Sequence, residues 1–236
     1  MKAWQDDQLQ ILLAEKNEHR VFDRLVDIAR QLGFDHCAYG LRPPLPLSRQ
    51  RIVMFNNYPA GWQARYAREN YLAVDPTVQH GLKSPLPVIW TDDFFAGARE
   101  FWEEARGHGL RYGWAQPCRD SRGTLGMFTV ARSEEALSDL EMQEKNIRLA
   151  WLTQIAHLAM TNALIKKLVP EASVRLSAQE TTVIRWTAEG KTTAEISLIM
   201  NLSVRTVTFH IGNVVKKLNA SNKTAAAVRA AVLGLL

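Results

Sequence analysis

The strongest constraint on the fold is a series of helix signals in the last third of the chain. Serine or threonine caps stand where three helices are expected to start: Ser177, Thr192 or Thr193, and Ser203. Glu180 completes a capping box at the first, and Gly190 marks the end of that helix. Short helices joined by turns predict an all-α domain of the helix-turn-helix kind over residues 176–236. We expect four helices in this domain, these three and one more in the residues that follow them.

The third of these helices has two different faces. Its apolar stripe is predicted from Val204, Val207, Ile211, Val214, Val215 and Leu218. The polar positions lie largely elsewhere: Arg205, Thr206, Thr208, Asn213, Lys216 and Lys217. A helix of this kind suits the major groove of DNA, with its first residues facing bases and its lysines facing phosphates. The alternative for such charges is a solvated helix face.

The distribution of charge favours the DNA interpretation. Of the net charge of +5, four charges come from residues 171–236, where eight basic residues stand against four acidic ones. The predicted DNA contacts also include Lys191, Thr192 and Thr193, which stand at the expected start of the preceding helix.

The first part of the chain is organised around residues 58–90, where aromatic side chains surround one carboxylate. Trp62 and Tyr66 are four residues apart, so a helix starting near Pro59 places both on one face. Asp75 has two interpretations: an N-cap followed by proline, or a ligand-binding acid, and one carboxylate can serve both. Core packing is the alternative for the aromatic side chains.

Short strands alternate here with amphipathic helices. The predicted strands are 36–41, 51–58, 112–119 and 124–132, and the predicted helices include 21–32, one capped by Asp92 or Asp93, and one from Ser138 to Lys167. This order predicts an α+β protein whose N-terminal domain is an α-β-α sandwich with an antiparallel sheet. Period-two spacing puts Ile52 with Met54 on one face, and Met127 with Thr129 on another strand. Ala38 leaves room there for a ligand or for a tight helix contact.

Pro170 divides the chain. It cannot continue the preceding helix, and the residues after it suit an exposed linker over 169–175. The predicted domains are therefore 1–168 and 176–236.

Several classes of function are excluded by missing motifs. No zinc-protease, serine-hydrolase or clustered His/Cys motif is present, and the Gly190-Lys191-Thr192 triplet lacks the first glycine of a phosphate loop, so we expect neither an enzyme nor a metal site. The two cysteines form no disulfide framework. With no signal peptide and no apolar run long enough for a bilayer, we expect a cytoplasmic protein without a membrane partner.

The order Tyr58, Trp62, Tyr66, Asp75-Pro76, Trp90, Trp102 and Gly113, followed by a helix-turn-helix, resembles the LuxR-type quorum-sensing transcription regulators. Within that family, FWEEA at 101–105 and KKLNASNK at 216–223 look most like QscR-type receptors. The resemblance implies an N-acyl-homoserine lactone as ligand rather than a cofactor, promoter DNA, a homodimer and RNA polymerase as partners. The alternatives are a sensor of a different small molecule and a ligand-independent DNA-binding regulator.

The resemblance also implies roles for single residues. Trp62 would donate to the lactone carbonyl and Asp75 would accept from the ligand amide, while Tyr58 and Thr129 would donate to the amide carbonyl. The walls of the pocket would be Tyr66, Trp90, Phe101, Trp102 and Ala105. Two departures from the family pattern bear on which acyl chain is preferred: Ala38 stands where the resemblance implies a serine, and Thr129 carries an extra methyl group over serine. A third bears on DNA: Thr208 stands where many family members carry a lysine, which implies a weaker phosphate contact.

Overall fold

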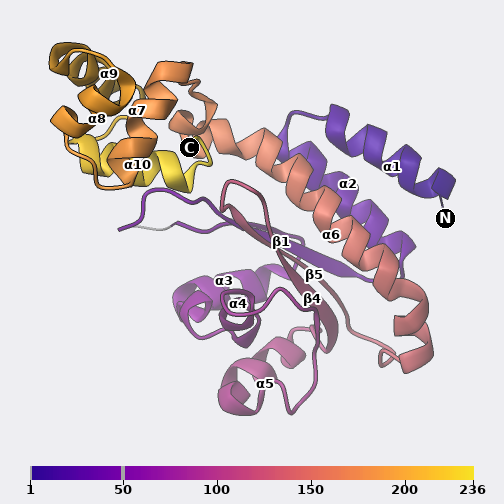
Figure 1. Cartoon of the computed structure of the whole chain (residues 1–236). Helices are drawn as coiled ribbons and strands as arrows, with labels where there is room; N and C mark the ends of the chain where they lie inside the picture. Colours follow the sequence, from indigo (N-terminus) through magenta and orange to yellow (C-terminus); the bar gives the residue numbers. More distant parts are fainter. Residues whose placement is uncertain (1, 49–50) are drawn as a thin grey trace. The chain divides into compact units, whose positions relative to one another are not determined.

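The computed structural model describes residues 2–48 and 51–236, which divide into two compact units (Figure 1). The first unit holds most of the chain up to Leu164. The second holds Ile165–Leu236, together with Ser121–Gly123 and the loop that begins at Pro43. None of the helices in the described part of the chain has the length and hydropathy needed to span a bilayer.

A five-stranded antiparallel sheet forms the centre of the first unit. Its strands are β1 (His36–Arg42), β2 (Val53–Asn56), β3 (Val88–Ile89), β4 (Tyr112–Arg119) and β5 (Leu125–Arg132), in the order β2-β1-β5-β4-β3. The sequence predicted β1, β4 and β5 to within one residue. It overestimated β2, because the predicted strand 51–58 is paired with β1 only in its middle, and it missed β3, which is too short to show an alternating pattern.

Helices cover both faces of this sheet (Figure 1). On one side lie α1 (Lys2–Ala14), α2 (Glu18–Gln31) and the long α6 (Asp139–Leu168); on the other lie α3 (Ala60–Arg68), α4 (Pro76–Gly81) and α5 (Arg99–Gly107). Two 3₁₀ turns, η1 (Tyr71–Ala73) and η2 (Ala96–Ala98), connect elements of the second group. The predicted α-β-α sandwich is therefore confirmed.

The face of the sheet toward α2 and α6 is a packed core. Tyr39 of β1 is fully buried there and its hydroxyl lies 2.8 Å from Nδ1 of His157 on α6. On α2 the apolar positions recur at helical spacing and are buried, from Val21 to Ala29. Asn17 caps this helix by accepting from the backbone N–H groups of His19 and Arg20.

One predicted helix start in the first unit is wrong, and a second, at Ser138, is right in position but lacks half of the capping box expected with Glu141. Asp92 and Asp93 do not cap α5, which begins at Arg99. Instead, Asp92 accepts a hydrogen bond from the Trp102 indole at 2.7 Å. Ser138 does accept from the backbone N–H of Glu141, but the Glu141 carboxylate pairs with Arg132 rather than completing a capping box.

The second unit contains four helices after a 3₁₀ turn, η3 (Pro170–Ser173). They are α7 (Ala178–Ala188), α8 (Thr193–Met200), α9 (Val204–Lys217) and α10 (Lys223–Val232). The capping box of Ser177 and Glu180 is confirmed, and Thr192 forms a second one with Glu195. The four-helix prediction is thus correct for this unit.

Two details of the second unit contradict the sequence interpretation. The segment 169–175 is not wholly exposed, because Val169 and Ala172 are buried in the core formed with Ile184 and Val214. Val204 was expected in the buried stripe of α9 but is about half exposed, because it lies in the first turn of the helix, outside the stripe that packs on α7 and α8.

Candidate ligand pocket and DNA-binding face

A cavity of about 390 Å³ opens on the face of the sheet that α3, α4 and α5 cover. This volume lies within the range of about 300–1,000 Å³ that is usual for small-molecule sites. Strand register builds its floor: Ala38 is paired with Asn56 and Thr129, and Gly40 with Met54 and Met127. Cross-strand partners share a face of the sheet, so the small residues of β1 run between larger ones on β2 and β5.

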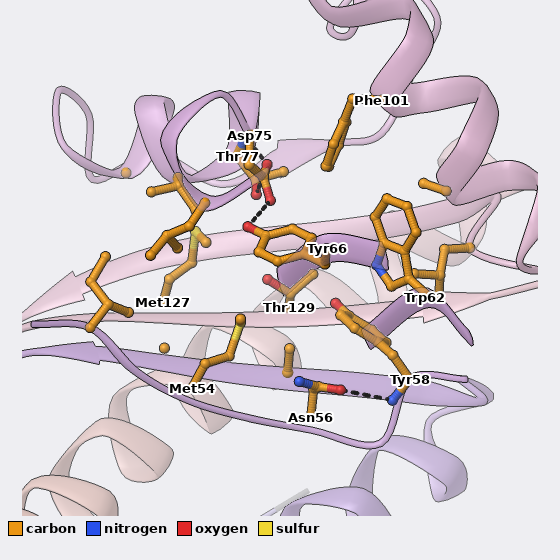
Figure 2. Close-up of a pocket in the computed structure, with 18 of the residues that line it drawn as sticks. Met54, Asn56, Tyr58, Trp62, Tyr66, Asp75, Thr77, Phe101, Met127 and Thr129 are labelled. Carbon is orange, nitrogen blue, oxygen red and sulfur yellow. Dashed lines mark hydrogen bonds between the residues drawn. The ribbon is translucent and has the colours of Figure 1, made fainter. Parts of the chain in front are cut away.

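All the residues predicted for the ligand site line this one cavity. They are Ala38, Ile52, Met54, Tyr58, Trp62, Tyr66, Asp75, Trp90, Phe101, Trp102, Ala105, Met127 and Thr129. Figure 2 shows that the polar and aromatic groups gather toward one end and the two methionines toward the other. The sequence did not predict Arg42, Thr77, Phe95 or Leu110, which also contribute to the lining.

Asp75 caps a helix and also faces the cavity, which are the two interpretations that the sequence left open. Its Oδ1 atom accepts from the backbone N–H of Thr77 at 2.8 Å and from the Thr77 hydroxyl at 2.6 Å, which caps α4. Its Oδ2 atom accepts from the Tyr66 hydroxyl at 3.0 Å (Figure 2). A carboxylate oxygen has two lone pairs, so Oδ2 can accept a further hydrogen bond from a ligand.

Burial sets the protonation of the groups around Asp75. Desolvation raises the pKa of the Asp75 carboxyl, while the hydrogen bonds from Thr77 and Tyr66 oppose that rise. Burial also raises the pKa of Tyr58 and of Tyr66, and the nearby Asp75 charge raises both further. Both phenols therefore stay protonated at neutral pH and available as hydrogen-bond donors.

Aromatic rings close the polar end of the cavity. Trp62 is 2% exposed and packs edge to face on Phe101 with ring centroids 5.5 Å apart. The Trp90 ring lies close to Gly113, where an added Cβ would come within 2.4 Å of ring atoms. The Trp90 indole N–H is buried and has no hydrogen-bond partner among the described residues. Because Gly113 has no side chain, the Trp90 ring fits beside it and forms part of the cavity wall.

An ion-pair network that the sequence did not predict supports these rings. The Arg65 guanidinium of α3 pairs with Glu104 of α5 through two hydrogen bonds, and the Tyr71 hydroxyl donates to the same carboxylate at 2.8 Å. Arg65 and Glu104 are 39 residues apart in the sequence, so no local pattern reveals the pair. The network joins the helix that carries Trp62 to the one that carries Phe101.

The side chains that most often bind metal ions are distributed over the part of the chain that the structure describes. No group of three or more His, Cys, Asp or Glu side chains gathers there in an arrangement that could hold an ion. The buried thiols of Cys37 and Cys118 are free, and burial raises the pKa of each to about 12.

The predicted DNA-contacting residues lie around the exposed side of α9 and the start of α8. Arg205, Thr208 and Lys216 are exposed, whereas Thr206 and Asn213 are partly buried. Lys191 and Thr193 are partly buried and Thr192 is exposed at the cap of α8. The sequence therefore placed most of these residues on an accessible side of the helix-turn-helix.

Several of the predicted contacts, among them Lys217 and Thr208, are engaged within the unit. The Lys217 ammonium lies 2.6 Å from the buried carboxylate of Glu180, so it joins α9 to α7. The Thr208 hydroxyl donates to the backbone carbonyl of Val204 at 2.8 Å. The Lys217 ammonium and the Thr208 hydroxyl are therefore less available for contacts with DNA than the sequence suggested.

Comparison with known proteins supports both halves of this description. Residues 17–160 match the autoinducer binding domain model, and residues 174–230 match the model of bacterial regulatory proteins of the luxR family. The chain belongs to the LuxR family of transcription regulators.

Its relatives are similar over almost their whole length. The transcriptional activator protein AnoR of Acinetobacter nosocomialis is 44% identical over all of both chains. The quorum-sensing regulator RhlR of Pseudomonas aeruginosa is 39% identical over 92% of this chain and 89% of its own. These proteins are transcription regulators and not enzymes. The finer resemblance to QscR-type receptors is not confirmed.

Solved structures similar to this LuxR-family chain include two with a described ligand or ligand dependence. SdiA in complex with octanoyl-rac-glycerol superposes with a TM-score of 0.84 at 33% identity and covers 99% of this chain and 95% of its own. CepR2 of Burkholderia cenocepacia, described as N-acylhomoserine lactone dependent, superposes with a TM-score of 0.62 at 31% identity over 67% of this chain and 94% of its own. The protein is therefore a quorum-sensing transcription regulator with an autoinducer-binding domain and a helix-turn-helix DNA-binding domain.

Proposed function

We propose that the autoinducer is an N-acyl-homoserine lactone, held in the cavity with its headgroup at the aromatic end. The observation that carries this proposal is the buried position of Asp75 Oδ2, which accepts from the Tyr66 hydroxyl and has a second lone pair that a ligand can use. An amide N–H can donate a hydrogen bond to this oxygen. Burying the amide N–H of the ligand without an acceptor would be costly. That CepR2 is a lactone-dependent relative supports the same ligand class.

The rest of the headgroup would use the donors around Asp75. Trp62 donates its indole N–H to the lactone carbonyl, and Tyr58 and Thr129 donate to the amide carbonyl. The raised pKa of Tyr58 supports this role, because the phenol keeps its proton. Phe101, Trp102, Ala105, Tyr66 and Trp90 enclose the ring, and the acyl chain runs over Ala38 toward Ile52, Met54 and Met127.

The regulator would act as a cytoplasmic homodimer on a two-fold promoter site. Along α6, Leu140, Ile147 and Leu158 are exposed, and their spacing of seven and eleven residues places them on one face. Such a stripe suits a self-complementary contact between two copies. Two copies of the helix-turn-helix domain, with proposed limits at 176 and 236, would then present two α9 helices to DNA and bring RNA polymerase to the promoter.

The test is the melting temperature of the full-length protein against lactones of graded chain length, with Trp62→Phe alongside. A lactone present at 100 times its Kd should stabilise the protein by about 2.7 kcal/mol, and Trp62→Phe should reduce this at the same concentration. If the lactones shift both proteins equally, the headgroup assignment is wrong. If no lactone shifts a folded, ligand-free protein, the ligand class is wrong.

A second ligand class is favoured by one specific observation. SdiA, whose structure is similar over nearly the whole chain, holds octanoyl-rac-glycerol, which has an acyl chain but no lactone or amide. Monoacylglycerols therefore belong in the same panel. Stabilisation by the glycerol ester alone would replace the lactone as ligand and leave Asp75 without an amide partner.

A further inference from the structure

The most exposed large hydrophobic side chain on α9 is aromatic. Phe209 is 63% exposed, whereas the other apolar residues of the helix interior, Val207, Ile211 and Val214, are buried. With a rotation of roughly 100° per residue, Phe209 lies opposite that buried stripe, on the same side as Arg205 and Lys216. A phenylalanine thus occupies the centre of the exposed face of α9, a helix that lies within the segment matched by the luxR family model. Figure 1 shows where α9 lies among the other helices of its unit.

The polar side chains beside Phe209 are less available than their types suggest. The Thr208 hydroxyl is donated to Val204, and the Thr206 hydroxyl lies 2.7 Å from that of Ser203. His210 contacts the Phe209 ring edge on, with centroids 5.6 Å apart, and leaves the ring exposed. In the first turns of the helix, Arg205 and the Phe209 ring therefore present the largest outward surface.

Base-pair edges offer one apolar group in the major groove, the 5-methyl group of thymine. Exposing a phenyl ring to water on a helix face otherwise gains nothing, and packing it on a methyl group removes apolar area from water. We propose that Phe209 is a specificity-determining residue of this regulator and reads thymine through its methyl group. Family membership establishes DNA binding by this unit and assigns no base to this position.

Charge favours DNA over a protein partner as the occupant of this face. Helix α9 contains no acidic residue, and the ring is flanked by the cations of Arg205 and Lys216 four residues before and seven residues after it. These cations are placed to contact the phosphates on either side of a groove. A ring between them is held against the base edges.

The experiment uses binding sites selected from random duplex DNA by the full-length protein, purified with the ligand that stabilises it, or without ligand if none does. Each thymine of the selected site is then replaced singly by uracil, which removes only the methyl group. Affinity is measured at one fixed salt concentration. For the wild-type protein, a single uracil at the thymine that Phe209 contacts, in either half-site, should weaken binding about fourfold. This is the effect expected for one buried methyl-sized group.

The variants complete the test. Phe209→Ala should bind the thymine site at least about fourfold more weakly and should not distinguish uracil from thymine. Its salt dependence should equal that of the wild type, whereas Lys216→Ala should reduce the salt slope by about one. Val228→Ala, which truncates an exposed apolar side chain on α10, is the matched control and should change neither affinity nor methyl dependence.

Four results would overturn the proposal: a selected site without a preferred thymine, a wild-type protein indifferent to uracil at every thymine, Phe209→Ala binding as tightly as wild type, or Phe209→Ala with undiminished methyl dependence. Phe209→Leu separates folding from contact, since it keeps an apolar body at an exposed position. If Phe209→Ala binds DNA normally but fails to activate a promoter, the ring contacts a protein partner and the thymine assignment is wrong.

Discussion

At the scale of single residues, Asp75 joins structure to recognition. One carboxylate oxygen holds the first turn of α4, and the other faces the cavity beside Tyr66. The dipeptide Asp75-Pro76 revealed the cap from sequence alone, because proline after an acceptor side chain is a local signal. The direction of the second oxygen depends on α3, which the chain builds nine residues earlier, so no local rule predicts it.

Replacing Asp75 by asparagine should separate its two roles. Asparagine is as good an N-cap as aspartate, so the free energy of unfolding without ligand should change by less than about 1 kcal/mol. Losing the charged acceptor should weaken lactone binding about ten- to a hundredfold, which corresponds to about 1.5–3 kcal/mol. Titration calorimetry measures the affinity, and Asp75→Ala serves as the variant that loses both roles. Unchanged affinity of Asp75→Asn would contradict the amide contact.

At the scale of elements, the start of α6 is held by charge. The Glu141 carboxylate accepts from Arg132 of β5 at 2.8 and 2.7 Å and from Lys145 at 2.6 Å. The hydrogen bonds from Arg132, and then those from Lys145, lower the pKa of Glu141 to about 2. Because the folded protein holds this proton less tightly than the unfolded chain, the stabilisation is complete above about pH 4.5 and is lost as the pH falls toward 2.

Glu141→Gln should therefore lower stability by about 1.5–3 kcal/mol at pH 7 and should flatten the fall in melting temperature between pH 4.5 and 2. Thermal unfolding followed by circular dichroism over this pH range measures both effects. Glu144→Gln, an exposed position on the same helix, is the matched control and should behave as wild type. Equal acid sensitivity of Glu141→Gln and wild type would show that the pair carries no pH dependence.

Two adjacent lysines at the end of α9 should behave differently. Lys217 is paired with the buried Glu180, so Lys217→Met should leave that carboxylate without its cation and destabilise the second unit by about 1–3 kcal/mol. Lys216 is exposed, so Lys216→Ala should keep the stability and reduce the salt slope of DNA binding by about one. Melting curves and salt-dependent binding of both variants decide the matter. The opposite pattern would assign the phosphate contact to Lys217.

Elements with signals inside themselves were predictable, and those defined by distant partners were not. Caps at Ser177 and Ser203 fixed the starts of α7 and α9, because each cap lies within three residues of the N–H that it accepts from. The two residues of β3 are a strand only because β4 lies beside them. The prediction that Asp92 caps a helix was wrong for a similar reason, because its hydrogen-bond partner, the Trp102 indole, lies ten residues away in the sequence.

At the scale of the whole molecule, ligand binding and DNA binding belong to separate compact units. All thirteen predicted ligand-site residues fall in one cavity of the first unit. Nine were predicted from family resemblance, because the order of aromatic residues carries that information, and four, Ala38, Ile52, Met54 and Met127, from their positions on the predicted strands. The Arg65–Glu104 pair behind them was not predictable, since it needs the packing of α3 on α5. The sequence thus predicted many of the side chains that line the cavity, but not the ion pair that holds the surrounding helices together.

Each unit should respond to its own ligand. Lactone should raise the unfolding transition of the first unit, by about 2.7 kcal/mol at 100 times its Kd, and operator DNA should raise that of the second. Differential scanning calorimetry of the full-length protein with each ligand in turn resolves the two transitions. A single transition shifted equally by both ligands would show that the chain unfolds as one cooperative unit.

Three of the seven tryptophans of the chain, Trp62, Trp90 and Trp102, line the ligand cavity. Indole emission moves to shorter wavelength when water leaves the ring and is quenched by new contacts. The walls of the cavity are therefore a built-in fluorescent reporter, and ligands can be screened by intrinsic emission without attaching a dye. Trp186, which lies in the other unit, supplies a reference signal within the same molecule.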